Sequence, residues 1–321
     1  FGQGIAASYG AQLNLTDVAV VGNRETGIFL DRTGTHLDGR RVVVASTQVR
    51  AATGRLGWGI GVQGGATLDL FGAALVNNRT TGLLVSQTNS RASLTDYVIA
   101  STRPGRDSAD VEVAAHVSVQ LGGRLELTSG ALLGSSQLSL MVGGPGSQAR
   151  LTHSVIRGLT PLVTPARAVQ VGQGGTVTLS RVAVADIAAP GLESLGGTAT
   201  LDEVAFSDLT GPAVRSQMAG SVTGTRVTAE RATAAGIVAL SGGNVVLSDC
   251  VVRDTRAGPS ASGGQVGYGA ISQDGAAVSL ERCVFDRNAA AGLYAAGGAL
   301  SATGAVVRGS TPHFEHVCWN A

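Results

Sequence analysis

The chain has 321 residues, of which 44% are hydrophobic, 4% aromatic and 14% charged, and 47 residues are glycine. So large an apolar fraction excludes a disordered chain, and a formal net charge of +1 gives no reason to expect nucleic acid or an anionic membrane as a partner. No apolar run approaches the roughly 18 residues of a membrane-spanning helix, and three cysteines are too few for a disulfide framework.

A short template, apolar-x-Leu-x-x-apolar-x-apolar, recurs along the whole chain. Its clearest copies, in chain order, are LNLTDVAV (13–20), TLDLFGAAL (67–75), ASLTDYVI (92–99), VTLSRVAV (177–184), ATLDEVAF (199–206), VVLSDCVV (245–252) and VSLERCVF (278–285). With weaker copies included, the third template position falls at Leu15, Gly39, Leu70, Leu94, Leu127, Leu151, Leu179, Leu201, Gly224, Leu247, Leu280 and Ala302. The alternation of apolar and polar positions is the period of a β-strand and not of a helix.

Most copies are followed by a further short strand that begins with glycine: GIFL at Gly27, GIGV at Gly59, GLLV at Gly82, GIVAL at Gly236 and GLYA at Gly292. Each repeat therefore holds three short strands and three corners. Such a coil cannot bury its own apolar side, whereas stacked coils can. The sequence thus predicts an all-β solenoid, a parallel β-helix of about twelve coils with three short strands in each.

Residues 280–293, LERCVFDRNAAAGL, resemble the pectin-lyase-like right-handed parallel β-helix superfamily. So do the asparagines before the glycine-led strands, Asn23, Asn78 and Asn288, which we expect at left-handed corners. The resemblance covers nearly the whole chain and implies a fold more than a function. We expect one β-helix domain over residues 1–311, beginning in the middle of a repeat, and a C-terminal tail or cap over 312–321.

In a solenoid, equivalent positions of successive coils stack into rows. The row four residues past the template leucine should face outward, yet eleven of its twelve members are Ala or Val. A continuous apolar outer face is unusual on a soluble monomer. It predicts lateral self-association through Ala19, Val43, Ala74, Val98 and Ala131, unless missing upstream sequence or the chain's own loops cover it.

Two further rows carry specific expectations. Glu203, Arg226, Asp249 and Arg282 stand at one corner of four successive coils, and their alternating signs predict an exposed ladder of ion pairs. Cys250 and Cys283 occupy one inward position on adjacent coils. We expect them to be a reduced stack, with a disulfide as the alternative.

Four insertions fall at one corner of the coil, at residues 51–58, 101–110, 158–167 and 255–268. Because they share a corner, they should project from the same side and wall a groove. Arginine beside aromatic rings suits an anionic or neutral sugar chain. The predicted ligand-binding residues are Arg55, Trp58, Arg167, Arg256 and Tyr268. The alternative is that these segments are ordinary solvated loops.

The catalytic motifs of the pectin-lyase-like enzymes are absent, so we expect no enzyme. If the chain is one, Arg103, Arg106, Asp107 and Asp110 are the catalytic candidates of a polysaccharide lyase or hydrolase of an unrecognised family. No cofactor or metal is expected. Ca²⁺ is the alternative at Asp107, Asp110 and Glu112, the one dense acidic set, because hard cations need several converging oxygens.

The function predicted from these features is a secreted or cell-surface β-helical scaffold. It would bind a polysaccharide or a surface protein through its corner loops or its apolar lateral face. A lyase or hydrolase is the first alternative, and a filament or spike component is the second. The absence of lysine beside abundant Arg, Ala, Gly and Val is typical of a GC-rich bacterial genome.

Overall fold

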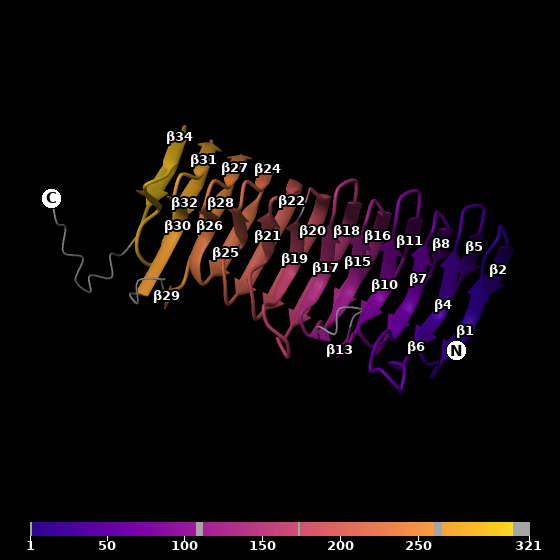
Figure 1. The fold of residues 1–321 in the computed structure, drawn as a ribbon. Helices are drawn as coiled ribbons and strands as arrows, with labels where there is room; N and C mark the ends of the chain where they lie inside the picture. Colours follow the sequence, from indigo (N-terminus) through magenta and orange to yellow (C-terminus); the bar gives the residue numbers. More distant parts are fainter. Residues whose placement is uncertain (1, 107–111, 173, 260–264, 311–321) are drawn as a thin grey trace.

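The computed structural model describes residues 2–106, 112–172, 174–259 and 265–310. They form a rod built of β-strands, with the first coils at one end and β33–β35 (residues 293–308) at the other (Figure 1). In this part of the chain, no helix is long and apolar enough to cross a membrane. The strands pair between coils into three parallel ladders that run along the rod.

Ladder 1 contains the glycine-led strands. Its sheet has thirteen strands, of which the short β29 (Gly258–Pro259) is antiparallel, so twelve are parallel. They are β1 (Gln3–Ala7), β4 (Thr26–Asp31), β7 (Trp58–Gln63), β10 (Thr81–Ser86), β15 (Ala115–Gln120), β17 (Leu138–Gly143), β19 (Arg167–Gly172), β21 (Leu192–Leu195), β23 (Val214–Gln217), β26 (Ala234–Ala239), β30 (Gln265–Gln273) and β33 (Leu293–Ala296).

Ladders 2 and 3 contain the two halves of the template. Ladder 2 has β2 (Gln12–Thr16), β5 (His36–Arg40), β8 (Thr67–Phe71), β11 (Arg91–Thr95), β24 (Ser221–Thr225), β27 (Asn244–Ser248), β31 (Ala277–Glu281) and β34 (Ala299–Thr303). Ladder 3 has β3 (Ala19–Val21), β6 (Val43–Ala45), β9 (Ala74–Val76), β12 (Val98–Ala100), β25 (Thr228–Ala232), β28 (Val251–Arg253), β32 (Val284–Asp286) and β35 (Val306–Arg308). In the middle coils, β16 (Arg124–Leu133), β18 (Gln148–Leu159), β20 (Thr176–Ile187) and β22 (Thr198–Leu209) run through both ladders.

The pairing register confirms the predicted rows. Leu15 pairs with Gly39, Gly39 with Leu70, and so on through Leu280 and Ala302, so the template leucines stack along the rod. Alternation then places one side of every strand inside, where Val, Leu, Ile and Ala form a continuous core. The apolar period of two thus determines both the strands and the face that each strand buries.

The glycine at the head of the ladder 1 strands is required by close stacking. A Cβ added to Gly27 would lie 2.6 Å from the carbonyl oxygen of Gly59, and one added to Gly59 would lie 2.5 Å from that of Gly82. At Gly27 and Gly59, therefore, no side chain fits between the stacked backbones. The same position on β15 is His116, which is fully buried.

Two expectations about buried polar and sulfur groups are wrong. Cys250 and Cys283 form a disulfide between adjacent coils instead of a reduced stack, since their Cα atoms lie 4.5 Å apart. Asn78 and Asn288 do not occupy the left-handed corner positions. The positive φ belongs to the preceding residue, and each asparagine side chain is buried and bonds the backbone of the preceding coil.

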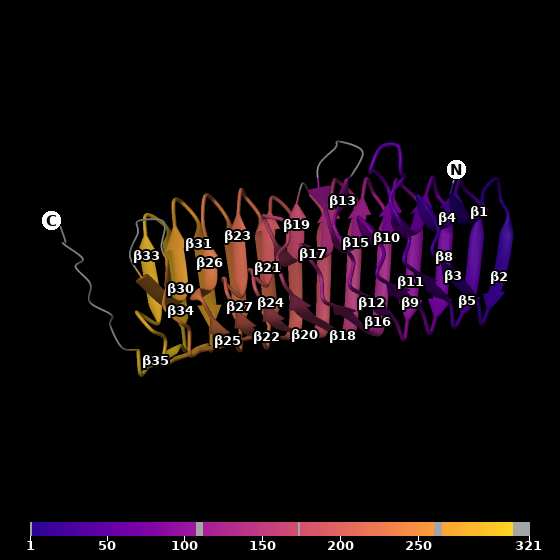
Figure 2. The ribbon, with the colours of Figure 1, turned by 90° about the horizontal axis from the view of Figure 1, so that it is seen from below.

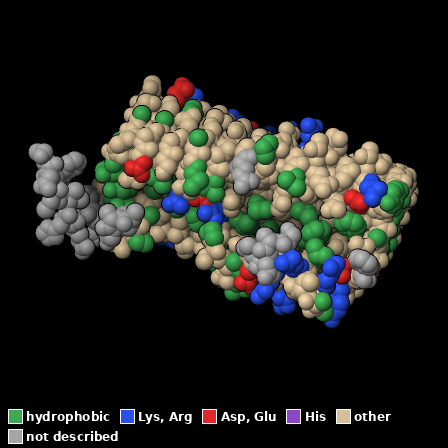
Figure 3. All heavy atoms as spheres, in the orientation of Figure 1, with side chains coloured by type: hydrophobic (Ala, Val, Ile, Leu, Met, Phe, Trp, Pro, Cys, Tyr) green, Lys and Arg blue, Asp and Glu red, His purple; other side chains and the backbone are tan. Residues whose placement is uncertain are grey.

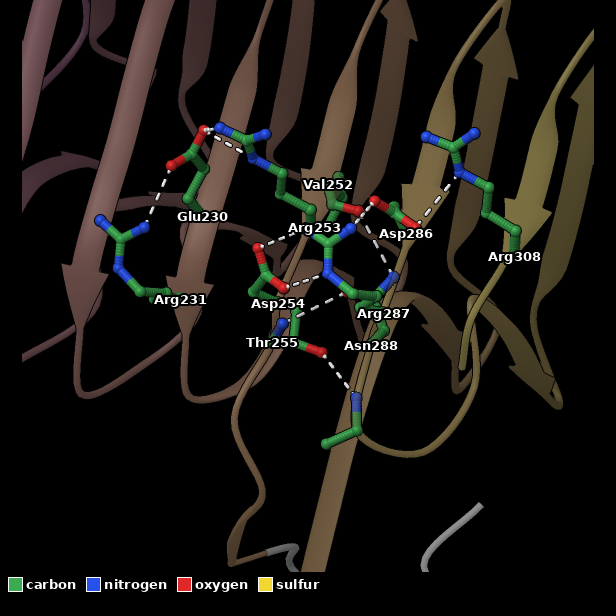
Figure 4. A network of polar contacts seen from close by, with 11 residues as sticks. Glu230, Arg231, Val252, Arg253, Asp254, Thr255, Asp286, Arg287, Asn288 and Arg308 are labelled. Atoms are coloured by element: carbon green, nitrogen blue, oxygen red, sulfur yellow. Dashed lines mark hydrogen bonds and ion pairs between the residues drawn. The ribbon is translucent and has the colours of Figure 1, made fainter. Parts of the chain in front are cut away.

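Ion pairs follow two corners of the solenoid. In the predicted row, Arg226 bonds Glu203 at 3.2 Å and Arg282 bonds Asp249 at 2.7 Å, which confirms pairing between coils. A second row, at the corner after ladder 3, lies between β25 and β35 (Figure 4). Its pairs are Arg231 and Arg253 with Glu230, Arg287 with Asp254, and Arg308 with Asp286. Pairs as exposed as these contribute little stability each.

Candidate functional site

The insertions share one corner, as predicted. They follow β6, β12, β18 and β28, and each precedes the ladder 1 strand of the next coil. The second insertion contains a small antiparallel pair, β13 (Gly105–Arg106) with β14 (Glu112–Val113). β13 lies at one edge of the rod, where a neighbouring insertion projects (Figure 2). The loops therefore border the outer face of ladder 1.

Two adjoining hollows lie on that outer face and form what we call the ladder 1 groove. One, of about 260 Å³, lies beside Leu56 and Trp58, and the other, of about 440 Å³, extends to Leu195 and Met218. Gln120 and Met141 line both hollows, so the groove is continuous along the rod. Apolar side chains line a depression in the middle of this face (Figure 3).

The outward positions of ladder 1 change character along the rod. Near the N-terminal end, Trp58 and Phe29 both lie against Gly61, where an added Cβ would be 3.1 Å from the Trp58 ring. Near the other end, Tyr268 and Tyr294 stack with ring centroids 4.6 Å apart. Burial is the main cause that raises the pKa of Tyr268, and the neighbouring Tyr294 raises it further. Half-buried aromatic rings thus lie at both ends of the face.

A charged cluster lies between these ends, beside the groove. The Glu193 carboxylate on β21 is fully buried although its position faces outward. It pairs with Arg167 of β19, with Arg215 of β23 at 3.3 Å, and accepts a hydrogen bond from Gln217 at 2.9 Å. Burial lowers the pKa of both arginines. Two guanidinium groups therefore surround this carboxylate.

The five predicted ligand-binding residues are spread along the rod. Trp58 lines the groove, and Arg55 lies in the loop just before it. Arg167 belongs to the charged cluster, and Tyr268 to the aromatic stack. Eight ladder steps separate β7 from β30, or about 40 Å at the usual strand spacing. Arg256 pairs with Asp208 at 2.9 Å, so it belongs to an ion-pair row.

The structure describes only some of the catalytic candidates. Arg103 lies beside Arg79 through a β-bridge, Arg106 ends β13, and Glu112 begins β14 and lines the groove. Asp107 and Asp110 lie outside the described residues, as does the predicted tail at 312–321. Within the described ranges, no three His, Cys, Asp or Glu side chains gather as a metal site would require.

Several residues on the outer face of ladder 1 escaped the sequence analysis, namely Gln120, Met141, Gln170, Glu193, Arg215 and Tyr294. They occupy the outward positions of the glycine-led strands, whereas the analysis of rows followed the template strands. Reading the glycine-led strands as rows would have found them, because the pairing places Met141, Gln170 and Glu193 side by side on successive coils.

The outward Ala and Val row of ladder 3 is exposed or half-buried throughout. Val43, Val98 and Val155 remain 37%, 39% and 39% exposed. This row and the ladder 1 groove are therefore two separate surfaces.

Comparisons with known proteins agree with this architecture. A family model described as a right handed beta helix region matches residues 146–311. Among solved structures, the chain is similar to the catalytic unit of the thermostable GH87 alpha-1,3-glucanase from Streptomyces thermodiastaticus strain HF3-3. The TM-score is 0.56 at 15% identity, over 97% of this chain and 63% of that chain.

The chain is also similar to a mannuronic acid specific polysaccharide family 6 lyase from human gut microbiota. The TM-score is 0.42 at 9% identity, over 92% of this chain and 78% of that one. At 15% identity, the similarity to the glucanase shows the fold alone. No curated protein matches the chain.

Proposed function

The chain belongs to the right-handed β-helix family, and from that premise we propose that it is a glycan-binding β-helix whose ligand lies along the ladder 1 groove. The observation that carries the proposal is the continuity of the groove, because Gln120 and Met141 line both of its hollows. An elongated groove on a rigid sheet suits a linear polymer better than a small molecule.

The chemistry of the face supports a carbohydrate. Gln120 and Gln170 present amides, which donate and accept hydrogen bonds as sugar hydroxyls require. Trp58 and Tyr268 present rings against which the apolar face of a sugar can stack. We further propose a secreted or cell-surface location, supported by the Cys250–Cys283 disulfide, since disulfides persist in oxidising compartments.

Binding is favoured over hydrolysis by the described carboxylates. Glycosidases use two carboxyl groups about 5–9.5 Å apart. Glu193, on β21, is paired with two arginines. Glu112 lies beside β15, which is three ladder steps away from β21. Three steps amount to about 14 Å. A lyase or hydrolase remains the alternative that the same experiment examines.

The test is affinity electrophoresis against dextran, laminarin, alginate and polygalacturonate. Gln120→Ala should weaken binding of the preferred polymer at least tenfold, because it removes a side chain shared by both hollows. Gln148→Ala, an exposed glutamine on ladder 2, is the matched control and should bind as the unmodified protein does. Equal binding by both variants would contradict the proposal. Release of reducing ends or unsaturated products would support the enzyme.

A second candidate function is lateral self-association through the outward row of ladder 3, favoured by its exposed valines. Val98→Arg should shift the sedimentation coefficient to that of a monomer. Val246→Arg, at an equally exposed position on ladder 2 (40% against 39%), should leave the assembly intact. A monomeric unmodified protein would contradict this candidate.

A further inference from the structure

A row in which three of four side chains are basic follows the corner between ladder 3 and ladder 1. Arg24 is bridged to Gln48, and Arg79 to Arg103, while the Arg79 amide bonds the carbonyl of Thr47. Arg24, Gln48, Arg79 and Arg103 therefore stand one above another on four successive coils. Figure 3 shows basic side chains gathered where the N-terminal insertions project, beside the apolar depression.

This row differs from the two ion-pair rows because its charges are not balanced. Arg79 and Arg103 form no ion pair with any described residue, and the Arg79 guanidinium donates only to the carbonyl of Pro104, at 3.2 Å. The nearby Glu25 is already held by Arg50, at 2.7 and 3.1 Å. Like charges on adjacent strands destabilise a sheet. A bound anion would remove this repulsion between the two arginines.

A hollow of about 410 Å³ adjoins the two arginines. Its lining includes Arg79, Arg103 and the hydroxyl-bearing Ser101 and Ser136. The two planar guanidinium forks and the Ser101 hydroxyl form a set of hydrogen-bond donors, whereas the Ser136 hydroxyl donates to the carbonyl of Thr102 at 3.1 Å. Arginine is the side chain best suited to bidentate recognition of carboxylate, sulfate or phosphate oxygens.

We propose that this hollow binds an oxyanion substituent, a carboxylate or a sulfate ester, carried by an acidic polysaccharide. The identity of the carrier rests on the proposed function, whereas recognition of the negative group rests on Arg79 and Arg103 alone. The site lies at the corner beside the groove, so one polymer can occupy the groove and present its charged substituents to the arginines.

The test compares dextran sulfate, carboxymethyl dextran and unmodified dextran, which share one backbone. Arg79→Gln and Arg103→Gln should each weaken binding of the preferred charged polymer at least tenfold and flatten its dependence on salt. Arg40→Gln is the matched control, since Arg40 is exposed on ladder 2 and forms no ion pair with a described residue. It should change affinity less than twofold. The charged dextran that binds more tightly identifies the oxyanion.

Three results would overturn the proposal: no binding of either charged dextran by the unmodified protein, equal losses in all three arginine variants, or equally tight binding of a single-stranded oligonucleotide. Gln120→Ala, measured on the same polymers, separates the two proposals. Loss of binding in Gln120→Ala alone supports the groove and overturns the oxyanion site. Loss in the Arg79 and Arg103 variants alone supports the oxyanion site and contradicts the groove.

Discussion

A buried residue can differ from the repeat only where the neighbouring coils leave space for its side chain. Tyr97 is an example: its ring lies against Gly130 on the next coil, where an added Cβ would be 2.4 Å away, and its hydroxyl donates to Ser154 two coils on, at 2.9 Å. Burial raises the pKa of Tyr97 to about 12, which keeps it a neutral donor. One large polar side chain is thus satisfied by a glycine and a serine on two further coils.

His116 is the second such residue, and it makes stability depend on pH. Burial lowers the pKa of His116 to about 3, and the backbone of Leu133 offsets this only partly. In the unfolded chain the ring takes up a proton near pH 6.5, so the unfolded state binds more protons below that pH. The contribution of the neutral ring is therefore lost progressively as pH falls from about 6.5 towards 3.

We predict that lowering the pH from 7 to 4 costs roughly 3 kcal/mol through His116 alone, the value given by its displaced pKa. His116→Ser, which copies the residue at the same position of the next coil, Ser139, should remove that part of the pH dependence. Urea unfolding at both pH values measures it. His153→Ser, at an exposed histidine, should leave the dependence unchanged. An unaltered pH profile in His116→Ser would contradict the assignment.

At the scale of strands and corners, backbone pairing and core packing hold the ladders together. Ion pairs between the side chains of neighbouring coils add to this. Arg231 bonds Asp208 at 2.7 Å and, with Arg256, lowers the pKa of that carboxyl to about 2. The ionised Asp208 therefore stabilises the folded state at pH values above its ordinary pKa. This stabilisation is lost as the pH falls towards 2. The disulfide between Cys250 and Cys283 is the one covalent link among the described coils.

The disulfide should stabilise the C-terminal coils. It spans 33 residues, and closing such a loop contributes about 3–4 kcal/mol by restricting the unfolded chain. The double variant Cys250→Ala, Cys283→Ala should therefore lower the unfolding midpoint, as should a reductant acting on the unmodified protein. Cys318→Ala serves as the control. Mass spectrometry of unreduced peptides would reject the pairing if Cys250 and Cys283 were recovered as free thiols.

At the scale of the molecule, the solenoid places unlike surfaces on different sides of one rod. The ladder 1 groove lies on one face, the insertions and the basic row at the adjoining corner, and the exposed valines on ladder 3. Each surface runs along many coils, so each suits an extended partner. Contacts with such a partner add up along the rod in steps of one coil.

We predict that affinity for the preferred glycan rises with its length. Rings lie at both ends of a face that extends about 40 Å from β7 to β30, so a short oligosaccharide reaches one end only. Titration calorimetry with a size-fractionated series should show tighter binding until the ligand covers the face. Tyr294→Ala should weaken the longest ligands and spare the shortest ones bound near Trp58. Affinity independent of length would contradict this arrangement.

Much of the fold was predictable from the sequence, because each coil repeats a local pattern. Alternation at Leu13, Leu15 and Val20 is enough to assign strands, and its recurrence assigns register and core, since a slip of one residue would expose every apolar side chain. The common corner of the insertions follows in the same way from their place between two strands of the template coil.

The candidate site was decided by tertiary structure. Gln120, Met141 and Gln170 belong to three different coils, and no spacing within a coil marks them as one groove. Nor does the sequence show that Glu193 is neutralised by Arg167 and Arg215, which lie 26 and 22 residues from it, or that Cys250 and Cys283 are bonded. Local periodicity determines which way a side chain points, whereas its partners depend on how coils of unequal length bring distant residues together.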